Sequence, residues 1–549
     1  MKAFTEPLLS LAGFEEMTKT AEKSSGLISV TGCIDAQKSQ MIYAFGGHRK
    51  NKLIVTFGEQ KAKELYDEYS FFDKEVVYYP SKDVLFYQSD IRGNLLTAER
   101  IRALKAIHEQ ESVTLVTTFD ALMNTMAPIE KMWENVLTLE QGQLLDLKEI
   151  QAALIRMGYE KEYQVQTMGQ FSVRGGILDV FPLTEENPIR IELWGDEIDT
   201  IRYFDCESQK SIENIEQVSI YPAAELVLSD EEKAGGIEKL KAEAKRVSDK
   251  LRKQMKTEEA HRVSEMADEL TEEWGELSMY AGMDAFLSYF FDERVGILDY
   301  FKPSDSLIFF DELTRCTEQG KLTETEFSES MKQRLAMGYI LPGQMNGLFT
   351  EKEIVAKLEK YSCIALAALD NKANGLHQLG SYGIHCQSVS PYNNSFELLI
   401  KDLKRYKKNG YRVILLSGSR TRAKRLSEDI TDQGITCFYT ENYDHELSEG
   451  QIMVCYGKVR RGFEYPILKF AVITESDIFG AQQKKKKRHR SYEGEKIQSF
   501  TDLSVGDYVV HENHGLGIYR GIEKLEVDKK VKDYIKIEYQ GGSNLYILA

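Results

Sequence analysis

The sequence predicts a multidomain α/β protein that ends in a small β module. Its 549 residues exceed the roughly 250–300 residues at which a single hydrophobic core stops growing. Apolar strands alternate with amphipathic helices in residues 1–125 and again in 346–480, a pattern typical of mostly parallel sheets. Residues 497–549 instead contain short strands separated by glycine turns, which favours a barrel-like β fold.

The composition narrows the class of protein further. No run of about 18 apolar residues predicts a membrane-spanning helix, and the N-terminus lacks a signal-peptide pattern. The seven cysteines are scattered and form no Cys-x-x-Cys pair, which argues against a disulfide framework or zinc site and indicates reduced cytosol. We therefore expect a cytoplasmic protein without a metal centre. The net charge of −17 gives no overall attraction to DNA.

The first α/β segment contains four candidate strands and two candidate helices. Apolar side chains at helical spacing predict helices over 61–71 and 97–109. The candidate strands are the apolar runs at 27–30, 53–57, 76–79 and 113–117.

A candidate phosphate-binding loop follows the first of these strands. Residues 32–39 match the template Gly-x4-Gly-Lys-Ser/Thr at Gly32, Lys38 and Ser39. Gln37 stands where the template has its second glycine, which lets backbone N–H groups curl around phosphate oxygens without a Cβ in the way.

An apolar run that ends in Asp311 and Glu312 resembles the strand and acidic pair that hold magnesium. One interpretation is an ATPase; the other is a strand, loop and helix that keep the fold but have lost the nucleotide. Because the match to an eight-residue template is incomplete, we favour the second interpretation. We therefore expect no catalytic residue, no metal ligand and no cofactor in this chain.

An arginine–glycine strand carries the clearest functional signal. Residues 170–182 predict a strand with a glycine-broken entry, and residues 189–196 predict a second strand that ends in a tight turn. Side chains alternate along a strand, so the isoleucines of the second strand face one side while Arg190 and Trp194 face the other. Trp194 is either an anchor for a partner protein, since binding hot spots are enriched in Trp and Arg, or a residue covered by its own chain.

Charged helices and a second α/β stretch come next. Lys and Glu with leucines at helical spacing predict long surface helices over 230–277. A lysine-rich block in 481–496 repels itself and predicts a flexible linker, with loose contact to DNA or an acidic partner as the alternative. Further strands are expected within 300–313 and at 411–416 and 470–474, with a helix from 421 or 422 to 433.

The final segment contains three short candidate strands and several glycine turns. The strands are expected at 508–511, 517–520 and 534–539. The sequence stops at 545–549, in or just after a strand, which is an unusual place for a natural end, so we expect a truncated protein.

The block 170–205, continued by residues 221–223, resembles the N-terminal region that UvrB-type excision-repair helicases share with bacterial transcription-repair coupling factors. Three features favour the coupling factors. The phosphate loop is incomplete at Gln37, and residues 78–87 lead on to Arg92 and Arg100 without the tyrosine-rich hairpin by which UvrB-type proteins enter DNA. Residues 506–521 look like the RNA polymerase interaction domain that coupling factors share with CarD-type regulators.

The resemblance implies an architecture for the whole chain. Residues 1–125 and 215–345 would form a degenerate RecA-like or helicase-like lobe, and 126–214 an inserted α+β domain that recruits UvrA. Residues 346–480 would form a second small α/β domain of undefined role. After the basic linker 481–496, residues 497–549 would form a small Tudor-like or CarD-like barrel that binds the β subunit of RNA polymerase.

In the family, an ATP-driven DNA translocase follows these parts and displaces stalled polymerase. We expect that motor to be absent here, together with its ATP, its magnesium and most of the DNA contacts. This chain should recruit rather than translocate, and no contact with a membrane is implied.

The resemblance also assigns contact residues. UvrA binding in the family is carried by positions that look like Arg174, Arg190 and Trp194 here. For Arg174, the alternative is an ion pair with a local carboxylate, Asp179 or Asp196.

For the polymerase, we expect strand pairing across an exposed sheet edge near residues 519–525, with Arg520 and Leu525 as side-chain contributors. Leu525 could instead belong to the core of the module.

Three functions remain to be compared. The leading one is an adaptor between RNA polymerase and UvrA in transcription-coupled nucleotide excision repair. The alternative from another class is a UvrB-type, ATP-dependent damage-recognition helicase. A third is a transcription regulator whose only working part is the β module.

Overall fold

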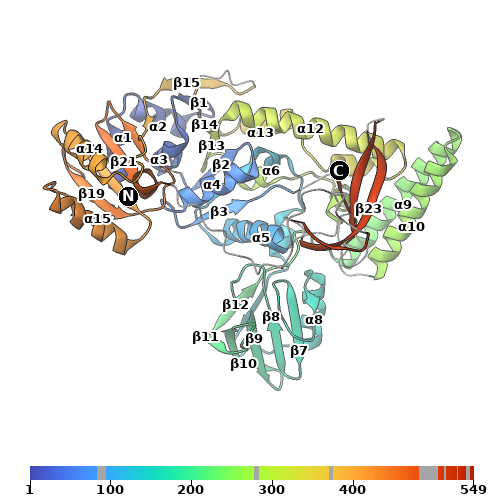
Figure 1. Ribbon diagram of the computed structural model, residues 1–549. Coiled ribbons are helices and arrows are strands. Elements are labelled where there is room, and N and C mark those ends of the chain that lie inside the picture. Colours follow the sequence, from blue (N-terminus) through green and yellow to red (C-terminus); the bar gives the residue numbers. More distant parts are fainter. Residues whose placement is uncertain are drawn as a thin grey trace.

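The chain folds into a large parallel sheet and several smaller sheets, which confirms the multidomain α/β class (Figure 1). The described strands form five sheets. The computed structural model describes residues 1–47, 49–82, 94–276, 283–369, 375–480, 505–511, 515–527, 530–538 and 544–548.

A seven-stranded parallel sheet forms the main body. Its strand order is β15-β1-β14-β13-β2-β4-β3. Neighbouring residues of one strand enter opposite cores, since Leu53 packs into one hydrophobic cluster and Ile54 into the other. Because both faces are covered, these strands are continuous apolar runs rather than alternating ones. The strands are β1 (Gly26–Thr31), β2 (Asn51–Thr56), β3 (Val76–Tyr79), β4 (Thr114–Thr118), β13 (Ser306–Asp311), β14 (Ser362–Leu366) and β15 (Gln378–Gly383).

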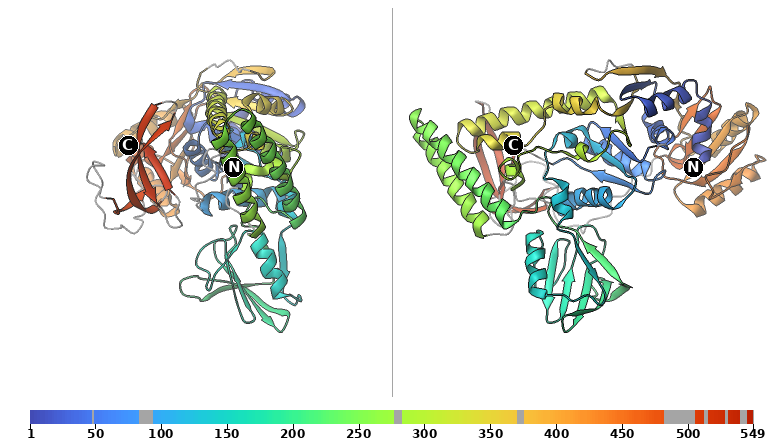
Figure 2. Two further views of the ribbon diagram at one scale, coloured as in Figure 1. Left: turned by 90° about the vertical axis from the view of Figure 1, so that its right-hand side faces the viewer. Right: turned by 180° about the vertical axis from the view of Figure 1, so that it is seen from behind.

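Helices cover both faces of this sheet (Figures 1 and 2). All four strands and both helices predicted for residues 1–125 are present, with ends shifted by at most three residues. The helices are α1 (Lys2–Leu9), α2 (Phe14–Lys23), α3 (Asp35–Gly46), α4 (Glu59–Tyr69), α5 (Asn94–Glu109), α6 (Phe119–Met123), α7 (Ile129–Trp133), α12 (Leu313–Ala336) and α13 (Glu351–Leu358).

The main body continues beyond residue 345, which is the boundary predicted from the sequence. Strands β14 and β15 both pair in parallel with β1, although more than 300 residues separate them from it. The second α/β sheet therefore begins only after β15.

The segment between β5 (Leu137–Glu140) and β12 (Gln217–Ile220) forms a module that projects away from the body in every view (Figures 1 and 2). Strands β5 and β12 pair antiparallel, so the chain enters and leaves the module side by side. A six-stranded sheet of order β11-β10-β9-β8-β7-β6 forms the module, and α8 packs on one of its faces. The elements are α8 (Leu147–Arg156), β6 (Glu160–Lys161), β7 (Gln170–Arg174), β8 (Ile177–Val180), β9 (Ile189–Trp194), β10 (Glu197–Phe204) and β11 (Ser211–Ile215).

Two long helices follow, as the sequence predicted for 230–277. Helix α9 (Asp230–Lys253) begins with a capping box in which the Ser229 and Glu232 side chains satisfy each other's backbone N–H groups. It packs against α10 (Thr257–Glu276) around a buried seam that includes Trp274. Short helices then return the chain to the body: η1 (Met283–Phe286), α11 (Leu287–Phe290), η2 (Ile297–Tyr300) and η3 (Pro342–Asn346).

The second α/β sheet has the order β16-β20-β21-β17-β19-β18. Its central pairs are parallel, and β20 joins β21 antiparallel. One of its faces shares a hydrophobic cluster with the main body, in which Met453 and Val472 occur together with Phe4. The elements are β16 (Gln387–Ser388), α14 (Phe396–Lys408), β17 (Arg412–Ser417), α15 (Arg420–Asp432), β18 (Phe438–Tyr439), β19 (Ile452–Tyr456), β20 (Phe463–Tyr465), β21 (Phe470–Thr474) and α16 (Glu475–Phe479).

The described strands of the C-terminal segment form a four-stranded antiparallel sheet. The predicted linker at 481–496 lies outside the described residues. Within the described ranges, no helix has the length and apolar character needed to cross a bilayer. The strands are β22 (Tyr508–His511), β23 (Gly515–Val527), β24 (Lys530–Glu538) and β25 (Asn544–Leu548).

Candidate functional site

Two hairpins of the projecting module carry the arginine–glycine motif. Strands β7 and β8 are joined through Gly175, and β9 and β10 through Gly195; both glycines have positive φ, at 61° and 67°. Such a backbone conformation strains residues that carry a Cβ, so glycine suits both turns. The two turns lie next to each other, because the backbone N–H of Leu193 donates to the Gly176 carbonyl at 2.8 Å.

The predicted alternation along β9 is confirmed. Ile189 and Ile191 are fully buried in the core of the module, whereas Trp194 is 85% exposed. The chain therefore does not cover Trp194 with a loop of its own, and that alternative is wrong. An exposed indole at the end of a rigid strand has the size and amphipathic character of a binding hot spot.

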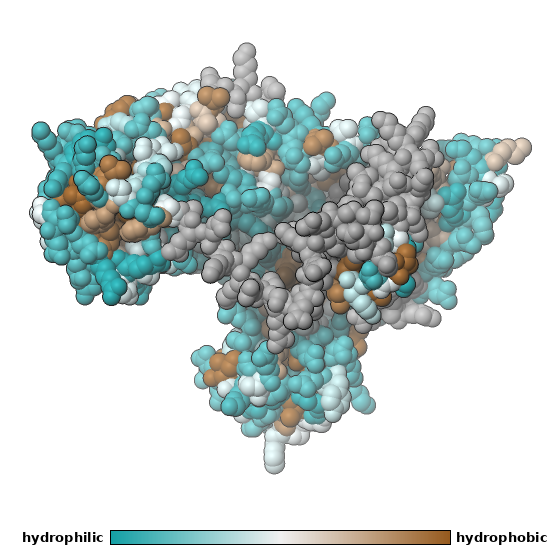
Figure 3. Space-filling model, viewed as in Figure 1, coloured by the Kyte–Doolittle hydropathy of each residue, from teal (hydrophilic) through white to brown (hydrophobic). Residues whose placement is uncertain are grey.

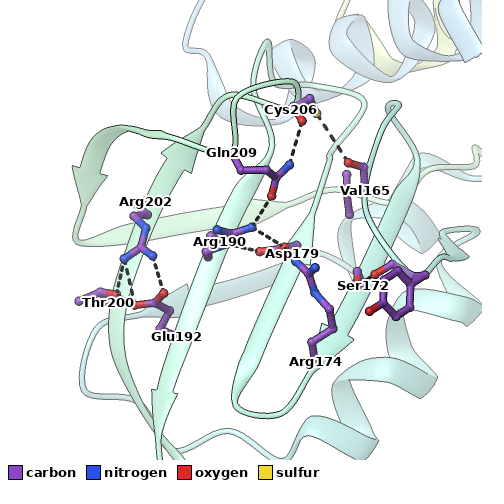
Figure 4. Close-up of polar contacts among 11 residues, drawn as sticks. Val165, Ser172, Arg174, Asp179, Arg190, Glu192, Thr200, Arg202, Cys206 and Gln209 are labelled. Atoms are coloured by element: carbon purple, nitrogen blue, oxygen red, sulfur yellow. Dashed lines mark hydrogen bonds and ion pairs between the residues drawn. The ribbon is translucent and has the colours of Figure 1, made fainter.

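A shared carboxylate gathers two arginines on the open face of the sheet (Figure 4). Asp179 in β8 is 1% exposed. One of its oxygens accepts from Arg190 Nε at 2.7 Å, and the other accepts from Arg174 at 2.9 Å and from a second Arg190 nitrogen at 2.8 Å. The alternative that paired Arg174 with Asp179 is thus confirmed as a contact, and Arg190 shares the same partner.

Further contacts fix the Arg190 side chain. It donates to the Gln209 amide oxygen at 2.9 Å, and its guanidinium carbon lies 4.3 Å from the centre of the Phe204 ring. Hydrogen bonding to Asp179 raises the pKa of the Arg190 guanidinium, so this group stays charged. A planar guanidinium held in this way is preorganised for a further contact on its free edge.

The two arginines differ in how much of each a partner can reach. The Arg174 side chain is 36% exposed, whereas that of Arg190 is 13% exposed. Arg174 and Trp194 are therefore available for direct contact, and Arg190 mainly holds the shared carboxylate. We did not identify Asp179 from the sequence as the partner of Arg190; the signal was an acidic residue between the apolar Leu178 and Val180, in a strand next to β9.

A second ion pair lies farther along the same face. Glu192 accepts from two nitrogens of Arg202, and hydrogen bonding to Arg202 lowers the pKa of the Glu192 carboxyl. The side chains of this pair are 31% and 20% exposed, so solvent screens their attraction.

The incomplete phosphate loop lies in the main body, between β1 and α3. Gly32 has a φ of 78°, and a Cβ there would lie 2.0 Å from the Ile384 carbonyl oxygen. Ile384 itself donates its backbone N–H to the Thr31 carbonyl at 2.9 Å. The start of the loop is thus packed closely against the segment that follows β15. Gln37 and Ser39 are both fully or almost fully buried.

Lys38 meets the acidic pair that the sequence singled out 273 residues away. Its Nζ lies 2.5 Å from Asp311 Oδ1 and 2.9 Å from Glu312 Oε1, and Asp35 lies 3.2 Å away. The Lys38 and Asp311 side chains are each 1% exposed. Burial alone would lower the pKa of Lys38, but the attraction of Asp311 and Glu312 outweighs it and raises that pKa.

The remaining bonds of the acidic pair are also made within the chain. Thr56 donates its hydroxyl to Asp311 Oδ2 at 3.0 Å, and the backbone N–H of Ala368 donates to Glu312 at 3.0 Å. The predicted lysine and carboxylates are therefore brought together, and Lys38 forms ion pairs with both members of the acidic pair.

In the C-terminal sheet, part of β23 has no backbone partner among the described residues along one edge. It pairs with β22 as far as Ile518, and Tyr519 exchanges backbone hydrogen bonds with Asp507 and Gly506. Beyond this point its described backbone partners belong to β24 alone. The edge predicted near 519–525 therefore starts just after Tyr519.

The two residues predicted on this edge lie in β23. Arg520 is exposed and pairs with Glu538 of β24. The backbone of Leu525 pairs with Lys532, and its side chain lies outside the described part of the structure. The choice between core and contact for Leu525 thus stays a prediction.

The sequence matches two protein families at the places where these surfaces lie. The UvrB interaction domain matches residues 137–226, which are the projecting module and its two connecting strands. The CarD-like/TRCF RID domain matches residues 503–548, the C-terminal sheet.

Over nearly its whole length the chain is similar to curated proteins that are named "Transcription-repair-coupling factor". The protein of Bacillus subtilis (strain 168) is 30% identical over 498 residues, which cover 90% of this chain and 42% of the relative. Those of Staphylococcus haemolyticus (strain JCSC1435) and Staphylococcus aureus (strain MRSA252) are each 29% identical, over 95% and 97% of this chain. The chain spans 42–45% of the length of these relatives.

Proposed function

We propose that this chain, whose homologues are transcription-repair-coupling factors, is an adaptor of transcription-coupled nucleotide excision repair. It would link a stalled RNA polymerase, bound through the β subunit, to the repair protein UvrA. The chain spans less than half of the length of its relatives. For the whole protein we therefore only propose DNA translocation, the use of ATP and magnesium, and most of the DNA contacts. We also propose that the adaptor acts in the cytoplasm.

The observation that carries this proposal is the open face of the projecting module. Trp194 is exposed at the end of β9, and Arg174 is partly exposed on the neighbouring hairpin, where it reaches toward Asp179. Trp and Arg are among the residue types enriched in the hot spots that dominate protein–protein binding energy. We propose that Arg174, Arg190 and Trp194 form the UvrA-binding site. Arg190 would act mainly through its hydrogen bonds to Asp179.

For the polymerase we propose pairing of a β-subunit strand with the edge of β23 beyond Tyr519. In such an arrangement backbone hydrogen bonds supply affinity, while alternate side chains supply specificity. Arg520 and Leu525 are the side chains we assign to this contact. We further propose that the complete C-terminal module closes into a small CarD-like barrel.

We also propose that the main body is a helicase-like lobe that has lost its nucleotide. The ion pairs of Lys38 with Asp311 and Glu312 support this, because in a nucleotide site those side chains would face phosphate and magnesium. Micromolar ATP binding by the purified chain would contradict it and would favour the UvrB-type helicase instead.

The adaptor role is tested by binding of the purified chain to UvrA. Trp194→Ala should lower the affinity at least about thirtyfold, because hot-spot truncation costs about 2 kcal/mol or more. The thermal unfolding of the variant should match that of the parent chain, since the side chain is 85% exposed. Retention of full UvrA binding by this variant would count against the proposal.

The polymerase contact is tested separately. Leu525→Arg should weaken binding to the polymerase β subunit and leave UvrA binding unchanged. If Leu525→Arg instead lowers the melting temperature of the chain, Leu525 belongs to the core of the C-terminal module.

A further inference from the structure

A second exposed apolar side chain lies beside Trp194, contributed by a different part of the chain. Leu144 precedes α8 and is 75% exposed, while the next residue, Leu145, is buried in the core of the module. The segment forms an isolated antiparallel bridge in which Leu144 lies opposite Glu197.

The strand register places Leu144 and Trp194 on one face. Glu197 is opposite Leu144 on one side and opposite Trp194 on the other, and directly opposed residues of antiparallel strands point to the same face. Backbone bonds from Leu145 to Asp196 (2.7 Å) and from Ile198 to Gln143 (2.9 Å) bracket the bridge. Leu144 and Glu197 therefore form a non-hydrogen-bonded pair, the kind in which side chains approach most closely.

The three residues define a compact surface, which we call the tip surface: Leu144, Glu197 and Trp194. Two strand spacings separate the Leu144 and Trp194 backbones, or about 10 Å. The two apolar side chains thus flank one exposed carboxylate at the outer end of the module. On the side of the molecule shown in Figure 3 most residues are hydrophilic and the hydrophobic patches are small, so a paired apolar site can stand out from its surroundings.

We propose that the tip surface is one contact site and that Leu144 is a second apolar anchor for the partner of Trp194. This inference rests on the proposed function, so the partner is UvrA. The chemistry of the tip surface requires a matching UvrA surface with apolar groups that cover both side chains and a cation opposite Glu197. Leu144 then contributes affinity, while the charge between the anchors favours one orientation of the partner.

The exposure of a single leucine is ordinary, but the strand register sets Leu144 apart. A scattered surface leucine has no fixed relation to a binding residue. Backbone hydrogen bonds of the flanking residues Gln143 and Leu145 hold Leu144 in line with Trp194, across the single intervening residue Glu197. A partner that covers the indole also reaches the leucine.

The test measures the affinity of full-length variants of the chain for purified UvrA. Leu144→Asp should weaken binding at least about tenfold, and Leu144→Ala by a smaller factor, because burial of a leucine side chain is worth roughly one to two orders of magnitude in affinity. Glu197→Lys should also weaken binding. The matched control is Leu369→Asp, since Leu369 is equally exposed at 75% and lies outside the module; it should bind like the parent chain.

The outcomes separate this inference from the function on which it rests. If Leu144→Asp and Leu144→Ala bind within twofold of the parent while Trp194→Ala fails to bind, the tip surface is wrong and the adaptor function stands. If Trp194→Ala also binds like the parent, the assignment of UvrA to this face fails as well. If Leu369→Asp weakens binding as much as Leu144→Asp, the effect does not belong to the tip surface and the inference is overturned. Thermal unfolding of each variant shows whether it is folded, and Leu144→Ala keeps the test decisive should the aspartate disturb the bridge.

Discussion

Two clusters of charged side chains, one around Lys38 and one around Asp179, are built on the same chemistry and differ in what surrounds them. In the main body one cation is shared by three carboxylates, and Lys38 and Asp311 are each 1% exposed. In the projecting module one buried carboxylate is shared by two arginines, of which Arg174 remains 36% exposed, and Trp194 of the same module is open. A buried ion pair contributes to the stability of the fold, whereas a charged side chain that is partly exposed on a sheet is available for contact with a partner.

The largest effect on stability should come from the enclosed cluster. Lys38→Met leaves Asp311 buried without its cation, and breaking a buried ion pair on one side costs about 3–5 kcal/mol. Urea unfolding followed by circular dichroism should show an earlier transition of the main body. The control is Lys19→Met, which removes an exposed lysine paired with Glu15 and should leave the unfolding curve unchanged. An unchanged curve for Lys38→Met would mean that the cluster contributes nothing to the fold.

The open cluster should give a smaller loss of stability together with a loss of binding. Asp179→Asn removes the charge that holds both arginines, and hydrogen bonds to charged groups contribute about 1.5–3 kcal/mol. Hydrogen exchange should therefore increase within 137–226, and UvrA affinity should fall because Arg190 is no longer held in place. Asp199→Asn, an exposed aspartate of the same module, is the control. If UvrA affinity survives Asp179→Asn, the arginines do not need their shared carboxylate for binding.

The smallest effect should come from the half-exposed pair of Glu192 and Arg202. Glu192→Gln should cost at most about 1 kcal/mol, because solvent screens exposed ion pairs. The pKa of Glu192 is lowered in the folded protein, so its contribution is present above the ordinary value of 4.5 and is lost as the pH falls below it. The difference in unfolding free energy between the parent chain and Glu192→Gln should thus vanish in acid. A difference that grows below pH 4 would show that the pair does not behave in this way.

Local sequence patterns correctly predicted helices, strands and the buried face of β9, because these features depend on residues that are close together in the sequence. The apolar runs at 27–30 and 76–79 became β1 and β3, and alternation alone placed Arg190 and Trp194 opposite the buried isoleucines. The phosphate-loop template likewise identified Lys38 and the acidic pair as related residues.

Pairings between distant segments could not be predicted in the same way. The sequence around β14 does not indicate that this strand lies between β1 and β13. Buried strands of a parallel sheet are similar apolar runs, whatever their position in the sheet. The end of the main body was therefore placed too early. A role for Leu144 could not be predicted for a similar reason, since the bridge to Glu197 is what aligns this residue with Trp194.

The antiparallel pairing of β5 with β12 has a consequence for how such proteins arise. Both connections of the module leave through adjacent strands, so its two ends lie within one strand spacing of each other. A gene segment that encodes residues 137–220 could be moved into another host loop with little disturbance to either core, since closely spaced ends make domain insertion well tolerated. The geometry of that junction suits the module to exchange as one unit, so that any surface it carries can pass between proteins whose remaining parts have diverged.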